Sequence, residues 1–145
     1  MNSALSIQKQ REIHATSQTV WNVLTNPVHI EQWLGVTMKT TWNIGDPISF
    51  QFMWKGEAYE DKGHVLQLEA PTVFSYDYWS GFSGMADSPE NYSVITFTLT
   101  NQDHLTILQL EHCNFATPTM YEHSDRNWEE ALNTIVRLAE SPVST

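Results

Sequence analysis

The sequence predicts an α+β fold in which a curved antiparallel sheet of about six or seven strands packs against one long C-terminal helix. Much of the chain beyond residue 35 alternates apolar and polar side chains with a period of two, as half-buried strands do. Residues 118–140 instead place their apolar side chains on one stripe at helical spacing. Helices segregated to one side of an antiparallel sheet define an α+β domain, here expected as a single domain over residues 1–145.

The first predicted elements are one strand and two short helices. Residues 5–13 alternate but remain polar on both faces, which indicates an edge strand. Thr16 or Ser17 is the expected N-cap of the first helix, which ends at Asn26-Pro27 because a residue before proline avoids the α region. The second helix ends at Gly35, a residue that tolerates the left-handed conformation.

The rest of the sheet comes from a series of strands joined by turns. These strands are predicted over residues 36–42, 48–54, 58–69, 73–79, 93–100 and 105–114. Residues 48–54 show the clearest alternation, and Gly63 predicts a bulge or kink in a longer strand. The main loop, residues 80–91, contains two glycines and a proline and is expected to fold over a neighbouring element.

The last helix supplies the apolar surface that the sheet needs. Thr117 is its expected N-cap, and Pro118 suits the first position, where a missing N–H costs nothing. The apolar stripe consists of Tyr121, Ser124, Trp128, Ala131, Leu132, Ile135 and Ala139. We expect this stripe to face the sheet and to leave a cavity between them, with its mouth at the first half of the helix and the 80–91 loop.

Charge and composition exclude several classes of protein. The 145 residues include 17 acidic and 7 basic side chains, a formal net charge of −10, which argues against nucleic acid or an anionic membrane as partner. No apolar run approaches the ~18 residues that a membrane-spanning helix requires, and no secretion signal is recognisable. Cys113 is the single cysteine, so no internal disulfide can form and a cytoplasmic location is expected.

Motifs for catalysis are absent from the sequence. No histidine or cysteine spacing matches a metal site, and no nucleotide-binding or nucleophile motif occurs, so we expect neither a metal nor a cofactor. Glu57, Glu60 and Asp61 are interpreted as part of a solvated face. His112 is the one histidine expected to face the cavity, either as a core histidine or as a polar anchor or acid/base for a ligand.

Aromatic residues on predicted inward faces are the positive functional signal. They indicate either a filled core or an apolar cavity with a few polar groups. The candidate ligand-binding residues are Phe50, Phe52, Trp54, Phe74, Tyr76, Tyr78, Phe82, Met85, Phe97, Leu110, His112, Met120, Tyr121, Ser124 and Trp128.

Local motifs in this order resemble the branch of the START-like (Bet v 1-like) superfamily that is similar to the activator of Hsp90 ATPase. The matching stretches are residues 16–25, residues 27–35 (PVHIEQWLG), residues 43–50, residues 63–66 with 70–76, residues 108–115, and Asn127-Trp128 with Leu132. Asn114 and Asn127 stand where glycine is common in the family. Asparagine tolerates a left-handed backbone, so the turn at Asn114 can be kept.

This resemblance implies a helix-grip fold, in which the sheet wraps around the C-terminal helix. It does not imply one shared reaction. We expect a non-catalytic protein that binds a hydrophobic small molecule or lipid in the cavity. Two alternatives are an Hsp90-type chaperone regulator, which would need an exposed recognition surface on the last helix or the strand edges, and a cyclase- or hydrolase-like enzyme.

Overall fold

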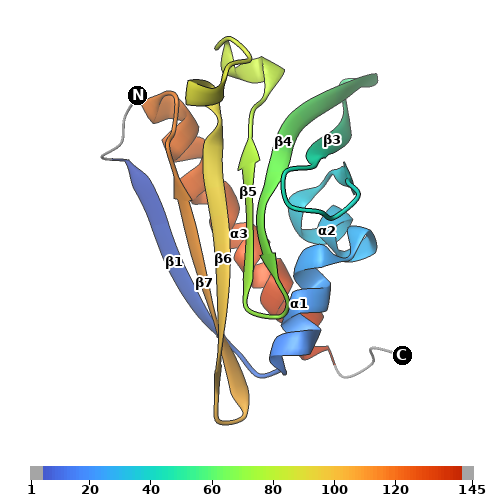
Figure 1. Ribbon diagram of the computed structural model, residues 1–145, viewed down its shortest axis with the longest axis vertical. Coiled ribbons are helices and arrows are strands. Elements are labelled where there is room, and N and C mark those ends of the chain that lie inside the picture. The colour runs from blue at the N-terminus through green and yellow to red at the C-terminus, as the bar shows by residue number, and fades with distance from the viewer. Residues whose placement is uncertain (1–4, 142–145) are drawn as a thin grey trace.

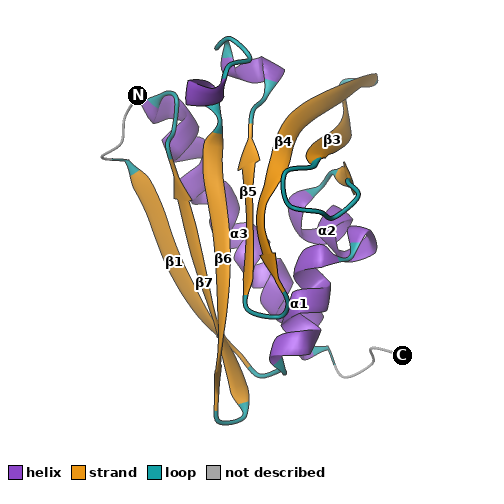
Figure 2. Ribbon diagram, in the orientation of Figure 1, coloured by secondary structure: helices purple, strands orange, loops and turns teal. Residues whose placement is uncertain are grey.

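A seven-stranded antiparallel sheet forms one layer of the protein, and three helices cover its inner face (Figures 1 and 2). The computed structural model describes residues 5–141, so the ends of the predicted 1–145 domain lie outside the described residues. Strand order is β1-β7-β6-β5-β4-β3-β2. This arrangement confirms the predicted helix-grip α+β fold. The elements are β1 (Ser6–Ile13), α1 (Ser17–Thr25), α2 (Pro27–Leu34), β2 (Thr37–Lys39), β3 (Pro47–Trp54), β4 (Glu57–Glu69), β5 (Val73–Tyr78), β6 (Ser93–Gln102), β7 (Leu105–Cys113) and α3 (Pro118–Glu140).

The two short helices begin and end where the sequence indicates. Thr16 caps α1, with its hydroxyl accepting a hydrogen bond from the backbone N–H of Thr19 at 3.1 Å. Asn26 ends α1 and caps α2 in turn, accepting from the N–H of Val28 at 3.0 Å. Gly35 then ends α2 with φ 77°, a left-handed conformation that favours glycine.

Strand β2 is shorter than the predicted 36–42. It covers only Thr37–Lys39, because the chain turns away at Trp42, where φ is 60°. Its pairing with β3 stops at Thr37 opposite Gln51. Residues 52–54 therefore have a neighbour in β4 but none on the β2 side among the described residues.

Gly63 in β4 is required by a close approach of β5. A Cβ atom at this position would lie 2.0 Å from the carbonyl oxygen of Asp77 and 3.1 Å from the ring of Phe50. The pairing of β4 with β5 also shifts register between Val65 and Gln67. The predicted irregularity in this strand is therefore present, with the bulge just beyond the glycine.

Helix α3 packs across the inner face of the sheet and contacts both the sheet and α2. Trp128 lies 5.7 Å from Phe97 of β6 and 6.2 Å from Trp33 of α2, measured between ring centroids. At the edge of the sheet, Lys9 and Arg11 of β1 form ion pairs with Glu129 at 2.5 and 2.8 Å.

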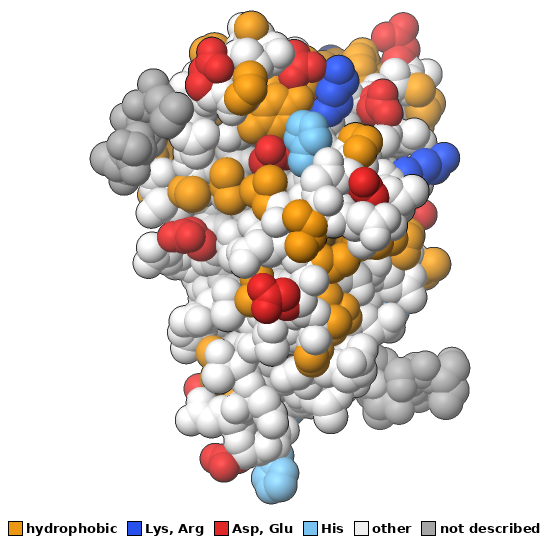
Figure 3. Space-filling model, in the orientation of Figure 1, with side chains coloured by type: hydrophobic (Ala, Val, Ile, Leu, Met, Phe, Trp, Pro, Cys, Tyr) orange, Lys and Arg blue, Asp and Glu red, His pale blue; other side chains and the backbone are white. Residues whose placement is uncertain are grey.

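No helix within residues 5–141 is long and apolar enough to cross a membrane. On the outer face of the sheet, acidic side chains outnumber basic ones (Figure 3).

Candidate functional site

A cavity of about 720 Å³ lies between α3, the end of α2 and the inner face of the sheet. Phe50, Tyr76, Tyr78, Ile95 and His112 form its wall on the sheet side. Polar side chains gather on the helical side, where most of them are exposed. The lining residues from the helices and their connection are Gln32, Trp33, Leu34, Gly35, Val36, Ser124, Asn127, Trp128, Glu130, Ala131, Asn133, Thr134 and Arg137.

Six of the fifteen candidate residues come together at this cavity. They are Phe50, Tyr76, Tyr78, His112, Ser124 and Trp128. Alternation along β3, β5 and β7 directs the first four to the inner face, and spacing along α3 directs the last two. They come from four elements, β3, β5, β7 and α3, so the cavity exists only in the folded chain.

Three other candidates are core residues that do not line the cavity. Phe74 and Phe97 are fully buried and stack on each other with ring centroids 6.3 Å apart. Leu110 is also buried. Met120 and Tyr121 are only partly buried and pack against the core near the start of α3, where Tyr121 contacts Phe115 edge-on at 5.5 Å.

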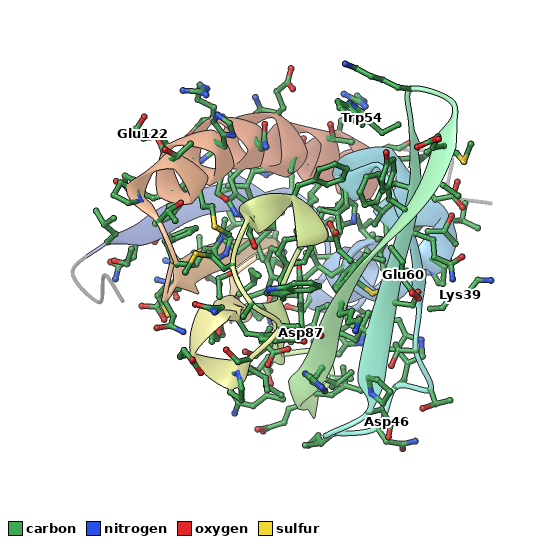
Figure 4. The ribbon with its side chains drawn as sticks, turned by 90° about the horizontal axis from the view of Figure 1, so that it is seen from above. Lys39, Asp46, Trp54, Glu60, Asp87 and Glu122 are labelled. Carbon is green, nitrogen blue, oxygen red and sulfur yellow. The ribbon has the colours of Figure 1, made fainter. Side chains whose placement is uncertain are left out.

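Phe52, Trp54 and Phe82 lie outside the cavity, where they form an aromatic cluster with Tyr59 at the outer end of the β3–β4 hairpin. Phe82 lies 4.8 Å from Tyr59 and 5.4 Å from Trp54 between ring centroids. Trp54 is 47% exposed, whereas the sequence pattern predicted an inward face for it, and the loop residue Phe82, a candidate for the cavity, is 55% exposed. Met85, also exposed, follows Phe82 in the same loop. Figure 4 shows Trp54 at the end of the hairpin.

The mouth of the cavity is not at the 80–91 loop. No residue of this loop lines the cavity, and the opening instead runs between residues 32–36 and residues 124–137 of α3. At the loop end, Phe82 packs on the hairpin and Tyr78 donates a hydrogen bond to the carboxylate of Asp61.

His112 is held in one orientation by two hydrogen bonds. Trp128 donates its indole N–H to His112 Nδ1 at 3.0 Å. An indole nitrogen can only donate, so Nδ1 must be the acceptor and the ring proton must be on Nε2. His112 Nε2 therefore donates to Ser93 Oγ at 2.8 Å, and Ser93 can in turn donate to the carbonyl of Tyr78 at 3.5 Å.

This network favours the interpretation of His112 as a core histidine. Both ring nitrogens already have partners, so neither is free to bind a ligand or to exchange a proton with one. Burial disfavours the charged imidazolium and lowers the pKa of His112 to about 3. The ring contributes a flat face to the cavity wall instead of an acid or base.

Asp61 is buried, and its interpretation as part of a solvated face was wrong. Its side chain points to the inner side of β4, opposite Phe50, and the residue is only 4% exposed. Burial raises its pKa, while hydrogen bonds from Tyr78, Ser80 and the backbone of Gly81 lower it. The alternation of Tyr59, Asp61, Gly63 and Val65 is the sequence signal that could have placed this carboxyl on the inner face.

Metal binding finds no support in the described residues, where no three His, Cys, Asp or Glu side chains converge as ligands would. The polar groups of the cavity lining are hydroxyls, amides and an imidazole, with the Glu130 carboxylate and the Arg137 guanidinium on α3. These groups can form hydrogen bonds with a ligand.

Comparisons with known proteins agree with the fold and identify a family. The family described as "Activator of Hsp90 ATPase homolog 1-like protein" matches residues 14–140. A solution structure of a protein from Cytophaga hutchinsonii is 35% identical over 100% of both chains, with a TM-score of 0.82. No curated protein matches the chain significantly.

Two more distant structures share the fold. CalU16 from Micromonospora echinospora is 23% identical, covers 94% of this chain and 76% of its own, and has a TM-score of 0.70. The Aha1 dimer of Colwellia psychrerythraea is 17% identical, covers 96% of this chain and 98% of its own, and has a TM-score of 0.73. Because the family match spans most of the sequence, the chain belongs to the family of activator of Hsp90 ATPase homolog 1-like proteins.

Proposed function

We propose that this protein binds an apolar or aromatic small molecule, or the apolar part of a lipid, in the cavity between the sheet and α3. At family level the fold supports either a ligand-binding or a regulator domain. The observation that favours ligand binding is the cavity itself. Its volume of about 720 Å³ lies within the range of small-molecule sites, and aromatic rings form its inner wall.

The arrangement of the lining suits a ligand that is apolar at one end. Phe50 and Ile95 on the sheet and Trp128 on α3 are almost fully buried, so they offer apolar contacts deep in the cavity. Asn127, Asn133 and Arg137 lie at the mouth and are exposed. A ligand could bury its apolar body against the rings while its polar end remains at the solvent boundary.

The neutral fluorescent dye N-phenyl-1-naphthylamine tests this proposal. We expect saturable binding by the wild-type protein with a rise in melting temperature. A concentration one hundred times Kd stabilises a folded protein by about 2.7 kcal/mol, which amounts to several degrees for a chain of this length. Fluorescence titration and thermal unfolding with and without the dye measure both effects.

Two neighbouring positions on α3 supply a blocking variant and its control. Ser124 lines the cavity, so Ser124→Phe should fill part of it and weaken dye binding at least about tenfold. His123 is exposed and does not line the cavity, so His123→Phe should bind as the wild type does. Equal binding by both variants, or no binding by the wild-type protein, would show the proposal to be wrong.

A regulator of an Hsp90-type chaperone is the second candidate function. The aromatic cluster of Phe52, Trp54, Tyr59 and Phe82 favours it, because two of its side chains, Trp54 and Phe82, are exposed, and exposed aromatic clusters are typical of a protein-binding surface. Direct association with an Hsp90-type chaperone is the measurement that tests this candidate.

A further inference from the structure

We propose that the cavity selects uncharged ligands carrying a carbonyl oxygen, which accepts a hydrogen bond from the hydroxyl of Tyr76. This inference rests on the proposed ligand binding and specifies the chemical class of the ligand. It follows from the polar groups on the inner wall of the cavity, of which Tyr76 alone is left without a partner among the described residues.

Tyr76 is fixed in the inner wall by its neighbours. It lies on β5 and is 2% exposed. Its ring centroid is 5.7 Å from that of Phe50 and 5.2 Å from that of Phe74. A phenol ring packed on two sides keeps its hydroxyl in a defined position, which is a requirement for selective hydrogen bonding.

The other polar groups on this wall are already satisfied. Tyr78 donates to Asp61, while His112 accepts from Trp128 and donates to Ser93. No described residue forms a hydrogen bond with Tyr76 Oη. His29 Nδ1 is the one fully enclosed side-chain polar atom without a partner in the described part of the chain, so Tyr76 Oη keeps contact with open volume.

The protonation of Tyr76 and the surrounding charges determine which ligand group fits. Burial raises the pKa of Tyr76 above its ordinary value, so the phenol remains protonated and can donate its hydrogen at neutral pH. The inner wall has no lysine or arginine. The one cationic residue of the cavity lining is Arg137, which is exposed on α3. A ligand carboxylate would be buried there as a charge without a counter-charge, which costs free energy. A carbonyl group is uncharged and avoids this cost.

A pair of probes that differ in one group isolates this hydrogen bond. In 2-acetylnaphthalene the carbonyl oxygen takes the place of the terminal CH₂ of 2-isopropenylnaphthalene, with little change in shape. Isothermal titration calorimetry gives the affinity of each probe for the wild type, Tyr76→Phe and Tyr121→Phe. Tyr121 is the control because it lies on α3 outside the cavity lining.

We expect the ketone-to-hydrocarbon affinity ratio to fall about 3- to 10-fold in Tyr76→Phe, the range that one neutral hydrogen bond provides. The ratio in Tyr121→Phe should equal that of the wild type. Binding of both probes with an unchanged ratio in Tyr76→Phe would overturn this inference and leave the proposed function standing. If neither probe binds a wild-type protein that does bind N-phenyl-1-naphthylamine, this inference alone is wrong, and if the dye does not bind either, both proposals are wrong.

An infrared measurement on the wild-type protein provides the same decision if Tyr76→Phe does not fold. A hydrogen bond to the bound ketone should move its carbonyl stretch to a lower frequency than the same ketone shows in hexane. An unshifted stretch in the bound state would contradict the inference.

Discussion

At the residue scale, His112 shows how a buried polar side chain can be both structural and part of a binding wall. Its two ring nitrogens connect Trp128 of α3 with Ser93 of β6, so the network crosses from the helix to the sheet. Each buried hydrogen bond adds about 1 kcal/mol, and removing one partner costs more because the other is left unsatisfied. The network therefore stabilises the helical side of the cavity against the sheet.

The buried neutral His112 predicts a specific dependence of stability on pH. Its pKa is about 3 in the folded state, against an ordinary value of 6.5, so on acidification the unfolded chain takes up the proton first. Stability is therefore lost as pH falls below about 6.5. Between pH 7 and pH 5 the unfolding free energy should fall about 2 kcal/mol more in the wild type than in His112→Gln.

Urea unfolding at the two pH values measures this difference. The matched control is His123→Gln, because His123 is exposed on α3 and takes no part in the hydrogen bonds of His112. The control should therefore retain the pH dependence of the wild type. Identical pH dependence in the wild type and His112→Gln would contradict the assignment.

Residue-level prediction from sequence succeeded where local chemistry decides. Asn114 was expected to tolerate a left-handed backbone, and its φ is 63°. Prediction from sequence failed for Asp61, because a carboxyl near a turn is usually solvated. The inward alternation of the strand and the hydroxyl of Tyr78 explain why this carboxyl is buried. The partners that make a buried charge tolerable come from distant parts of the chain, so local patterns do not reveal them.

At the element scale, the pairing of β4 with β5 depends on Gly63. This residue does not need a left-handed backbone, and its lack of a side chain is what lets the Asp77 carbonyl approach. Gly63→Ala would place a Cβ 2.0 Å from that oxygen, so the strands must separate. We expect a loss of about 1–3 kcal/mol or more in unfolding free energy.

Gly81→Ala is the matched control for this substitution. A Cβ at Gly81 would meet nothing within 4 Å, so we expect a change within about 0.5 kcal/mol. Urea unfolding of both variants compares the two glycines directly. Equal effects of the two substitutions would mean that the close approach at Gly63 does not control the stability of the sheet.

The boundaries of the sheet elements were less predictable than their existence. The alternation that predicted β3 continues through Trp54, but burial does not, because β2 ends opposite Gln51. Residues 52–54 therefore pair with β4 but have no β2 strand beside them. Periodicity describes which side chains share a face, whereas neighbouring strands decide whether that face is covered.

At the scale of the whole molecule, the two candidate functions use separate surfaces. The cavity opens between α3 and residues 32–36, whereas the aromatic cluster lies at the end of the β3–β4 hairpin, where Figure 4 shows Trp54. Phe52, Trp54, Tyr59 and Phe82 do not line the cavity. Substitutions at one surface can therefore leave the other intact, which makes ligand binding and chaperone binding separable by experiment.

The separation predicts opposite phenotypes for two variants. The double substitution of Trp54→Ser and Phe82→Ser should weaken association with an Hsp90-type chaperone about tenfold or more, because exposed aromatic residues are typical binding hot spots. It should still bind N-phenyl-1-naphthylamine. Ser124→Phe should lose dye binding and keep any chaperone association.

Surface plasmon resonance and dye titration on the same preparations compare the two variants. Chaperone binding that survives the double substitution would exclude the aromatic cluster as its site, and no binding by the wild type would exclude the regulator function for that chaperone.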